Sequence, residues 1–233
     1  LLDKPAGVPL GTAGGIYPAL MGSIYLGALS ALIGGILGIG AAIYLVFYGT
    51  GKRFSGLVNM AITGLSGIPS ILFGLVGYTL LIYRFGLSRS LLCSSLCVAA
   101  MIIPFVAIRA KKILDEKGRE YMKTSLSLGL SREYALRKMI LPACFVELLG
   151  TVALGMAYGM GAVAPILYTG AVMQADVPHS LSDPFMSLPY HLYILVNNGF
   201  SLDYAYGTAF VLMLFLLIIQ LICKFITYLR KDN

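Results

Sequence analysis

Five apolar stretches, each long enough to cross a lipid bilayer as a helix, constrain this chain more than any other feature. A spanning helix needs about 20 mostly apolar residues to cover the hydrocarbon core. Of the 233 residues, 58% are hydrophobic and 12% are charged, roughly half the charged fraction of a typical soluble domain. The sequence therefore predicts an all-α membrane protein and excludes an ordinary soluble one. The five stretches cover residues 17–48, 57–83, 90–108, 143–172 and 204–228.

Basic residues are divided unevenly between the segments that join these stretches. Link 49–55, link 109–141 and the tail after residue 222 contain 14 of the 17 Lys and Arg residues, whereas loop 174–203 has three Asp and no Lys or Arg. Positive charge concentrates on the cytoplasmic side of membrane proteins. We therefore expect segment 109–141 and the C-terminus to be cytoplasmic and loop 174–203 to be external. The net charge of +7 is then explained by basic residues in the cytoplasmic segments. No nucleic-acid partner is needed to account for it, and none is expected.

The start of the chain is unusual for a membrane protein. Five crossings and a cytoplasmic C-terminus leave the start of the chain outside, and the sequence opens at Leu1 without an initiator Met, a basic flank or an apolar signal segment. We expect another segment, most simply a sixth spanning helix, to precede Leu1. The visible residues 1–233 are then expected to form a single transmembrane domain.

Few residues offer the chemistry that enzymes or metal sites use. The four cysteines lie in apolar surroundings and form no CxxC pair, so we expect them to serve packing. His179 and His191 both fall in loop 174–203 without metal-ligand spacing, and we expect them to contact an external partner. No His lies in a span and no HExxH motif occurs, so a membrane-embedded enzyme lacks support.

One carboxylate lies inside a predicted span. Glu147 is five residues into the fourth apolar stretch, and an ionisable group there is a functional candidate. Because it lies close to the cytoplasmic interface, the alternative is that it reaches back to the interface or pairs with Arg137 or Lys138.

The cytoplasmic segment 109–141 has the strongest local pattern. Residues 116–128 suit a short amphipathic helix, Gly129 is a helix stop, and Ser131 is an N-cap for a second helix through Met139. Two helices joined at a glycine form a projecting knob. Apolar side chains on that knob favour a protein partner, and the alternative is a solvated basic loop that only fixes topology. These apolar residues are Leu126, Leu128, Leu130 and Tyr134.

The same segment resembles the EAA loop of type I ABC importer permeases. Residues 123–129 read KTSLSLG, and residues 139–142 read MILP at the spacing that motif requires. The family's Glu is replaced by Lys123. The resemblance implies a coupling helix that docks into a groove on a cytoplasmic ABC ATPase dimer, which binds the ATP and Mg while this chain holds no cofactor. The ATPase-coupling residues it implies are Tyr121, Lys123, Thr124, Ser125, Leu128, Gly129, Leu130 and Arg132.

Further stretches are similar to phosphate importer permeases of the PstA type. They are residues 15–25, 40–45, 67–74 (GIPSILFG) and 188–193 (LPYHLY), in the expected order along nearly the whole chain. The resemblance implies a six-helix permease whose first helix is absent here. It also implies a second, PstC-like permease subunit and an external solute-binding protein, docking near loop 174–203, in a bacterial or archaeal cytoplasmic membrane.

The substrate pathway departs from that subfamily. Its permeases carry an Arg four residues before a Glu in a Gly-Glu-Thr-Ala-Pro motif, and here Tyr158 and Ala162 occupy those positions, while Gly161, Ala164 and Pro165 keep the frame. No Lys or Arg lies deep within any predicted span, although an anion at mid-membrane needs a cation or N–H donors. Either a second subunit supplies the charge or the cargo is less charged than phosphate.

Breaks in two helices offer an alternative source of donors. Backbone groups near Pro69 and Pro165 could bind a hydroxylated or weakly anionic group. The alternative to substrate binding is a packing role, in which small residues here only let helices approach closely. The substrate-pathway candidates are Ser66, Pro69, Ser70, Tyr158, Gly161, Ala162, Pro165 and Thr169.

The reading that accounts for most of these features is the membrane subunit of an ATP-driven importer. It would form the pathway for phosphate or a similar small oxyanion and work by alternating access. Two alternatives stay open: the same architecture for a less charged solute, and a scaffold or sensor that keeps the permease fold without transport. No catalytic motif is present in this chain, so ATP hydrolysis is expected of a separate subunit.

Overall fold

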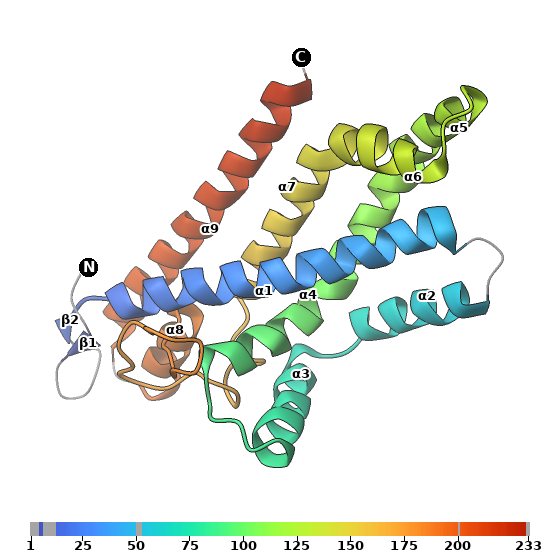
Figure 1. Cartoon of the computed structure of the whole chain (residues 1–233). Coiled ribbons are helices and arrows are strands. Elements are labelled where there is room, and N and C mark those ends of the chain that lie inside the picture. Colours follow the sequence, from blue (N-terminus) through green and yellow to red (C-terminus); the bar gives the residue numbers. More distant parts are fainter. Residues whose placement is uncertain (1–4, 7–12, 50–52, 200, 232–233) are drawn as a thin grey trace.

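The computed structural model describes residues 5–6, 13–49, 53–199 and 201–231 (Figure 1). Helices make up most of the described chain, which also contains loops, a two-residue pair of strands, β1 (Pro5–Ala6) and β2 (Ala13–Gly14), and an isolated bridge. The prediction of an all-α membrane protein is confirmed. Within the described residues, four helices are long and apolar enough to span a membrane, or five if a bent helix pair counts as one span.

Helix α1 (Tyr17–Ile43), which a π-helical turn extends to Tyr48, packs along α4 (Leu91–Ile113) and α7 (Leu141–Met160). Glycines permit this close approach, because a Cβ at Gly34 would lie 3.1 Å from the Ala99 carbonyl oxygen and one at Gly35 would lie 2.9 Å from Val152. Small residues at helix contacts are typical of membrane proteins, in which apolar packing replaces water exclusion. The glycine cluster of the first span is therefore a packing surface.

The second span is broken. Helix α2 (Arg53–Ser66) and helix α3 (Ser70–Gly77), which a π-helical turn continues to Arg84, meet at an angle of 104°. Pro69 cannot donate a backbone hydrogen bond and disfavours helix in the residue before it. The sequence predicted one span over residues 57–83 with a proline at its middle, and the structure replaces it by two helices in different directions (Figure 1).

The fourth span ends earlier than the sequence indicated. Helix α7 stops at Met160, and residues 161–170 form successive turns rather than helix. Pro165 supplies no N–H, and the turns instead pack across the start of α4, where the Ser90 N–H donates to the Thr169 carbonyl at 3.0 Å. The predicted stretch 143–172 therefore combines a span with a compact non-helical segment.

The third span and the fourth both run beyond the apolar stretches. Helix α4 continues through a π-helical turn into α5 (Arg119–Ser127), and α6 (Arg132–Ala135) continues into α7. The α5–α6 hairpin and helix α8 (Leu188–Asn197) lie at opposite ends of the molecule (Figure 1).

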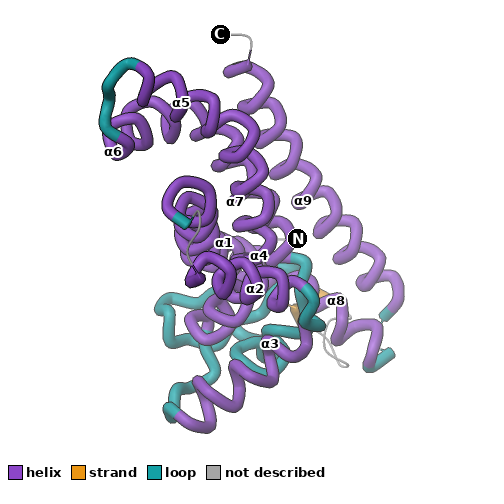
Figure 2. The backbone as a smooth tube through the Cα atoms, turned by 90° about the vertical axis from the view of Figure 1, so that its right-hand side faces the viewer, coloured by secondary structure: helices purple, strands orange, loops and turns teal. Residues whose placement is uncertain are grey.

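The last span, α9 (Leu202–Lys231), runs beside α7 (Figure 2). Its apolar side chains are largely exposed within this single chain, as at Phe210 and Met213. Such a helix is stable only with lipid or another subunit around it.

Candidate functional site: a cavity at the broken span and a helical hairpin

A cavity of about 220 Å³ lies at the break between α2 and α3. The end of α2 forms one side, the middle of α4 another, and the last turn of α7 contributes Tyr158. A broken helix leaves backbone groups without helical partners, and membrane proteins tolerate this only where the backbone is covered by protein or lines a water-filled space. The lining residues are Leu65, Ser66, Ile68, Phe73, Met101, Pro104, Phe105, Ile108, Arg109 and Tyr158.

Two of the predicted pathway residues meet in this cavity. Tyr158 stacks on Phe105 of α4, with ring centroids 5.5 Å apart and ring planes 20° from parallel. Ser66 reaches the cavity from the last turn of α2, and its hydroxyl donates to the Thr63 carbonyl oxygen at 2.7 Å. Residues about 90 positions apart in the sequence therefore share one wall.

The remaining pathway candidates do not line the cavity. Pro69 and Ser70 form the break itself, and α3 then packs on the turn after α7, because a Cβ at Gly74 would lie 2.7 Å from the Ala164 carbonyl oxygen and 3.0 Å from Pro165. The two broken segments are thus in direct contact. Gly161 is exposed after the end of α7, and Ala162 packs against the core.

Thr169 lies apart from this cavity. It is fully buried, its hydroxyl lies 3.0 Å from that of Ser94, and it donates to the Pro165 carbonyl oxygen at 2.9 Å. Its side chain therefore holds the post-α7 turn against α4.

Sequence reasoning missed the charged residue of the cavity. The sequence analysis placed Arg109 at the start of the cytoplasmic link, whereas the structure places it in α4. Its guanidinium carbon lies 4.8 Å from the Phe105 ring centroid. Side chains on a helix lean toward its N-terminus, so residues at i and i−4 meet. The four-residue spacing of Phe105 and Arg109 is the sequence signal that could have found this. Arg109 lies near the end of α4, so the expectation that no Lys or Arg lies deep within a span is not overturned; what the sequence missed is that Arg109 lines the cavity.

The hairpin has the local structure that the sequence predicted. Gly129 has a φ of 77°, the left-handed conformation that ends a helix, and the Ser131 hydroxyl accepts from the Tyr134 N–H to cap α6. Of the predicted ATPase-coupling residues, Leu128 is 70% exposed and Leu130 is half-buried. The other coupling residues that are exposed are Tyr121, Lys123, Thr124, Gly129 and Arg132.

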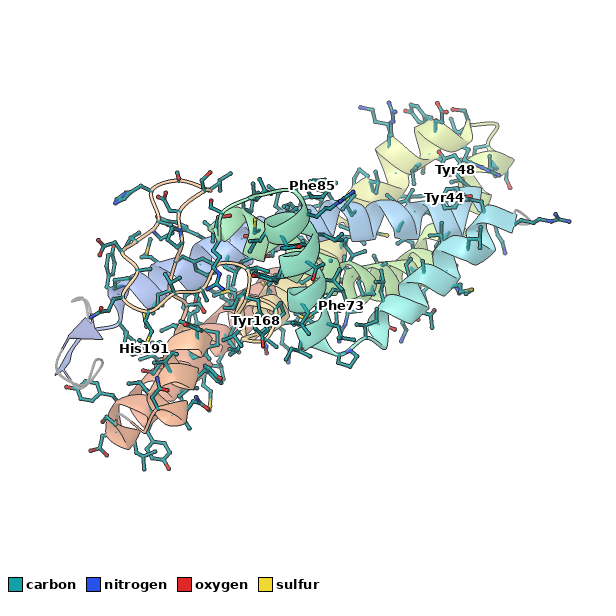
Figure 3. The ribbon with its side chains drawn as sticks, turned by 90° about the horizontal axis from the view of Figure 1, so that it is seen from below. Tyr44, Tyr48, Phe73, Phe85, Tyr168 and His191 are labelled. Atoms are coloured by element: carbon teal, nitrogen blue, oxygen red, sulfur yellow. The ribbon has the colours of Figure 1, made fainter. Side chains whose placement is uncertain are left out.

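Two coupling candidates contact the rest of the protein. Ser125 is buried and its hydroxyl donates to the Tyr121 carbonyl oxygen at 2.7 Å. Arg132 donates to the Phe47 carbonyl oxygen at 2.9 Å and lies over the Tyr48 ring at 5.9 Å. Figure 3 shows Tyr48 at the end of α1 that lies next to the hairpin. Arg132 therefore fastens the hairpin to the first span.

This arrangement of helices is shared with known transport proteins. Residues 34–229 match the family described as binding-protein-dependent transport system inner membrane component. The chain belongs to this family. It is therefore a multi-pass inner-membrane protein and the permease component of such a transport system, with the transmembrane fold of ABC importers.

Individual relatives agree with this assignment. A Mycobacterium bovis protein named phosphate transport system permease protein PstA 2 is 31% identical over 224 residues, 95% of this chain and 74% of that protein. A Methanocaldococcus jannaschii protein named probable phosphate transport system permease protein PstA is 29% identical over 223 residues, 94% of this chain and 77% of that protein.

A solved structure supports the same fold. The inward-facing MetNI methionine ABC transporter superposes with a TM-score of 0.71 at 16% identity, covering 91% of this chain and 95% of that chain. At this identity the likeness concerns the fold alone.

An ion pair attaches the permease's hairpin to a spanning helix. Glu147 on α7 pairs with Lys117, in the turn between α4 and α5, rather than with Arg137 or Lys138 as the sequence suggested. Lys117 precedes the hairpin in sequence but folds back beside α7. Together with Arg132, this pair links the hairpin to α1 and α7.

Residues 179–183, within the permease's loop 174–203, form a hydrogen-bonded turn. Asp183 accepts from the His179 and Ser180 backbone N–H groups and from the Ser180 hydroxyl, and these bonds hold the pKa of its carboxyl below the usual range. The Leu91 N–H donates to the Asp183 carbonyl oxygen at 2.8 Å, so the loop also caps α4.

The two histidines of this loop differ. His179 is exposed, as a contact to an external partner requires. His191 is 3% exposed within α8, and its Nδ1 lies 3.1 Å from the Thr208 hydroxyl on α9. The expected partner contact therefore fails for His191, which faces the protein interior (Figure 3).

Proposed function

We propose that this permease is the membrane-spanning subunit of an ATP-driven phosphate importer. Similarity over almost the full chain carries the proposal, because relatives named as phosphate transport permeases match 95% and 94% of it. A short shared motif would fit many cargoes, but similarity through all the spans includes the segments around the cavity. The fold of a solved importer subunit is consistent with this function.

The proposed orientation puts the α5–α6 hairpin and the C-terminus in the cytoplasm of a bacterium or archaeon. The unequal distribution of basic residues supports it. Segment 109–141 would act as the coupling loop, with the exposed Leu128 and Tyr134 entering a groove on an ABC ATPase dimer. ATP and Mg would bind to that dimer, and this chain would hold no cofactor and no catalytic residue.

Two further partners complete the proposed assembly. A second permease subunit, PstC-like, would pack beside this chain and cover apolar side chains that a single copy leaves exposed. An external solute-binding protein would meet loop 174–203, which offers Asp176, His179 and Ser180 on its surface. The lipid bilayer would surround the rest.

Alternating access suits the position of the cavity. The break in the second span, the last turn of α7 and the turn after it meet there, so a change in the relative tilt of these segments would change which side the cavity opens to. Closure of the ATPase dimer on nucleotide would move the hairpin, and the ion pair of Lys117 with Glu147 would pass that motion to α7.

A different cargo is the second candidate. Tyr158 and Ala162 occupy the positions at which the phosphate subfamily carries Arg and Glu, which favours a less charged solute in the same pathway. A scaffold or sensor without transport is the third, and the replacement of the family's Glu by Lys123 is the observation that favours it.

Uptake into proteoliposomes separates these candidates. The complete importer contains its ATPase, partner permease and loaded binding protein. It is supplied with ³²P-phosphate, and uptake is compared with and without an ATP-regenerating system. We expect ATP-dependent phosphate uptake that unlabelled phosphate competes and sulfate does not. Uptake of a neutral solute alone would replace phosphate as the cargo. ATPase stimulation without uptake of any solute tested would support the sensor.

A further inference from the structure

The cavity at the broken span contains a single formal charge. Nine of its ten lining residues are uncharged, and the tenth is Arg109. The nearby Lys111 does not compete for the role, because it lies outside the lining and donates to the Asn59 side-chain oxygen at 3.1 Å. Anything that enters the cavity therefore meets one cation.

The Arg109 guanidinium contacts an aromatic side chain and forms no ion pair with a described carboxylate. It lies over Phe105, and Tyr158 stacks on that same ring, so two aromatic side chains fix its position. The ion pairs of the described chain join Lys112 with Glu116, Lys117 with Glu147 and Arg119 with Asp115, and no described carboxylate lies within ion-pair distance of Arg109. Arg109 takes part in none of these ion pairs.

An aromatic face attracts a guanidinium without using its N–H donors. Those donors form a planar fork that matches two oxygens of a tetrahedral oxyanion. Arg109 is exposed within this chain, so its donors are accessible to a solute that enters the cavity. Arg109 therefore has a vacant coordination edge of the shape that an oxyanion fits.

The depth of the guanidinium suits a transport pathway. Arg109 lies near the end of α4, but its side chain runs back one turn to Phe105, which is about 5.4 Å along the helix axis. It thereby lines the same cavity as Ser66 and Ile68 at the break in the second span.

We propose that Arg109 binds the transported oxyanion in this cavity and is the charge-selective residue of this subunit's pathway. Phe105 and Tyr158 position it. The inference rests on the proposed transport function and names the residue that supplies the cation for it. A second permease subunit is then not the only source of positive charge.

The test compares three variants in the reconstituted importer. Arg109→Gln removes the charge, Arg109→Lys keeps it without the planar fork, and Lys111→Gln is the matched control two residues further along the same helix. Uptake of ³²P-phosphate and ³⁵S-sulfate is measured against the concentration of loaded binding protein. Size-exclusion profiles and basal ATPase activity establish that each complex is assembled.

We expect Arg109→Gln to lower the uptake turnover by about 10- to 100-fold, the range for losing a hydrogen-bonded charge. The half-saturating concentration of binding protein should stay unchanged, because that step lies outside the cavity. Arg109→Lys should retain an intermediate rate, and Lys111→Gln should match the unmodified protein. Equal turnover for Arg109→Gln and Lys111→Gln would overturn the inference.

The outcomes also separate this inference from the proposed cargo. If the unmodified importer carries phosphate and Arg109→Gln carries it equally well, the role of Arg109 fails and the phosphate assignment stands. If it carries sulfate instead, and Arg109→Gln loses that uptake, the phosphate assignment fails and the role of Arg109 stands. If it carries neither anion, both are overturned.

Discussion

The two ends of this permease are stabilised in opposite ways. The hairpin end carries ion pairs and exposed apolar side chains, as in the pair of Lys117 with Glu147 and the 70% exposed Leu128. At the α8 end, the contacts between α8 and α1 are buried and uncharged, as where the Leu188 N–H donates to the Ser23 hydroxyl at 2.8 Å. The difference indicates that the hairpin end is shaped for a partner, while the α8 end holds the helices together.

Overpacking the α8 end should have the largest effect. A Cβ at Gly22 would lie 2.0 Å from the Met186 carbonyl oxygen, whereas a Cβ at Gly40, on the same helix, would meet nothing within 4 Å. Gly22→Val should therefore destabilise the protein by about 3 kcal/mol or more, and Gly40→Val should be tolerated. Thermal melting of the two purified variants measures this, and equal melting temperatures would remove the contrast between the ends.

Acid should weaken the α8 end through His191. Burial lowers the pKa of this histidine to about 4 from its usual 6.5, so the unfolded chain takes up a proton at a higher pH than the folded chain does. The neutral form's stabilisation is complete above pH 6.5 and is lost as the pH falls toward 4. We expect a loss of about 3 kcal/mol over that window.

The exposed histidine provides the control for that prediction. Melting temperatures are followed from neutral pH to about pH 4 for His191→Gln and His179→Gln. His191→Gln should flatten the profile, and His179→Gln should leave it as in the unmodified protein. A profile that neither substitution alters would place the pH sensitivity elsewhere.

A charge on the hairpin surface should uncouple the importer without unfolding it. Leu128→Asp puts a carboxylate where the proposed ATPase groove would cover it, and burying an unpaired charge is costly. We expect ATP-driven uptake to fall by about tenfold, with an unchanged melting temperature. Lys123→Glu, which restores the residue of the related loops, should keep or raise the uptake. A lower melting temperature for Leu128→Asp would mean that Leu128 serves the fold.

The ion pair beneath the hairpin should have the smallest effect. Both partners are partly exposed, with side-chain exposures of 51% for Lys117 and 31% for Glu147, and such pairs contribute up to about 1 kcal/mol. Lys117→Glu and Glu147→Lys should each lower the number of solute molecules carried per ATP, and the charge-swapped double variant should recover it. Failure of the double variant to recover would show that the two residues act separately.

Local signals predicted the hairpin end better than the cavity. The glycine stop at Gly129 and the cap at Ser131 depend on residues within one helix turn, so a single stretch of sequence suffices. The cavity brings together Ser66, Phe105 and Tyr158 from three helices. The sequence indicated two of these residues, but nothing in it placed them beside each other or beside Arg109.

The sequence by itself determined the class of this protein, because hydropathy, basic-residue bias and capping signals act within one span or one link. Only the tertiary structure decided the 104° break at Pro69, the end of α7 at Met160 and the ion-pair partner of Glu147. It also placed the Arg109 guanidinium at the cavity. The physical reason is that a proline only permits a break and a charge only requires a counterpart. Which break forms and which counterpart is met depends on helices packed together from distant parts of the chain.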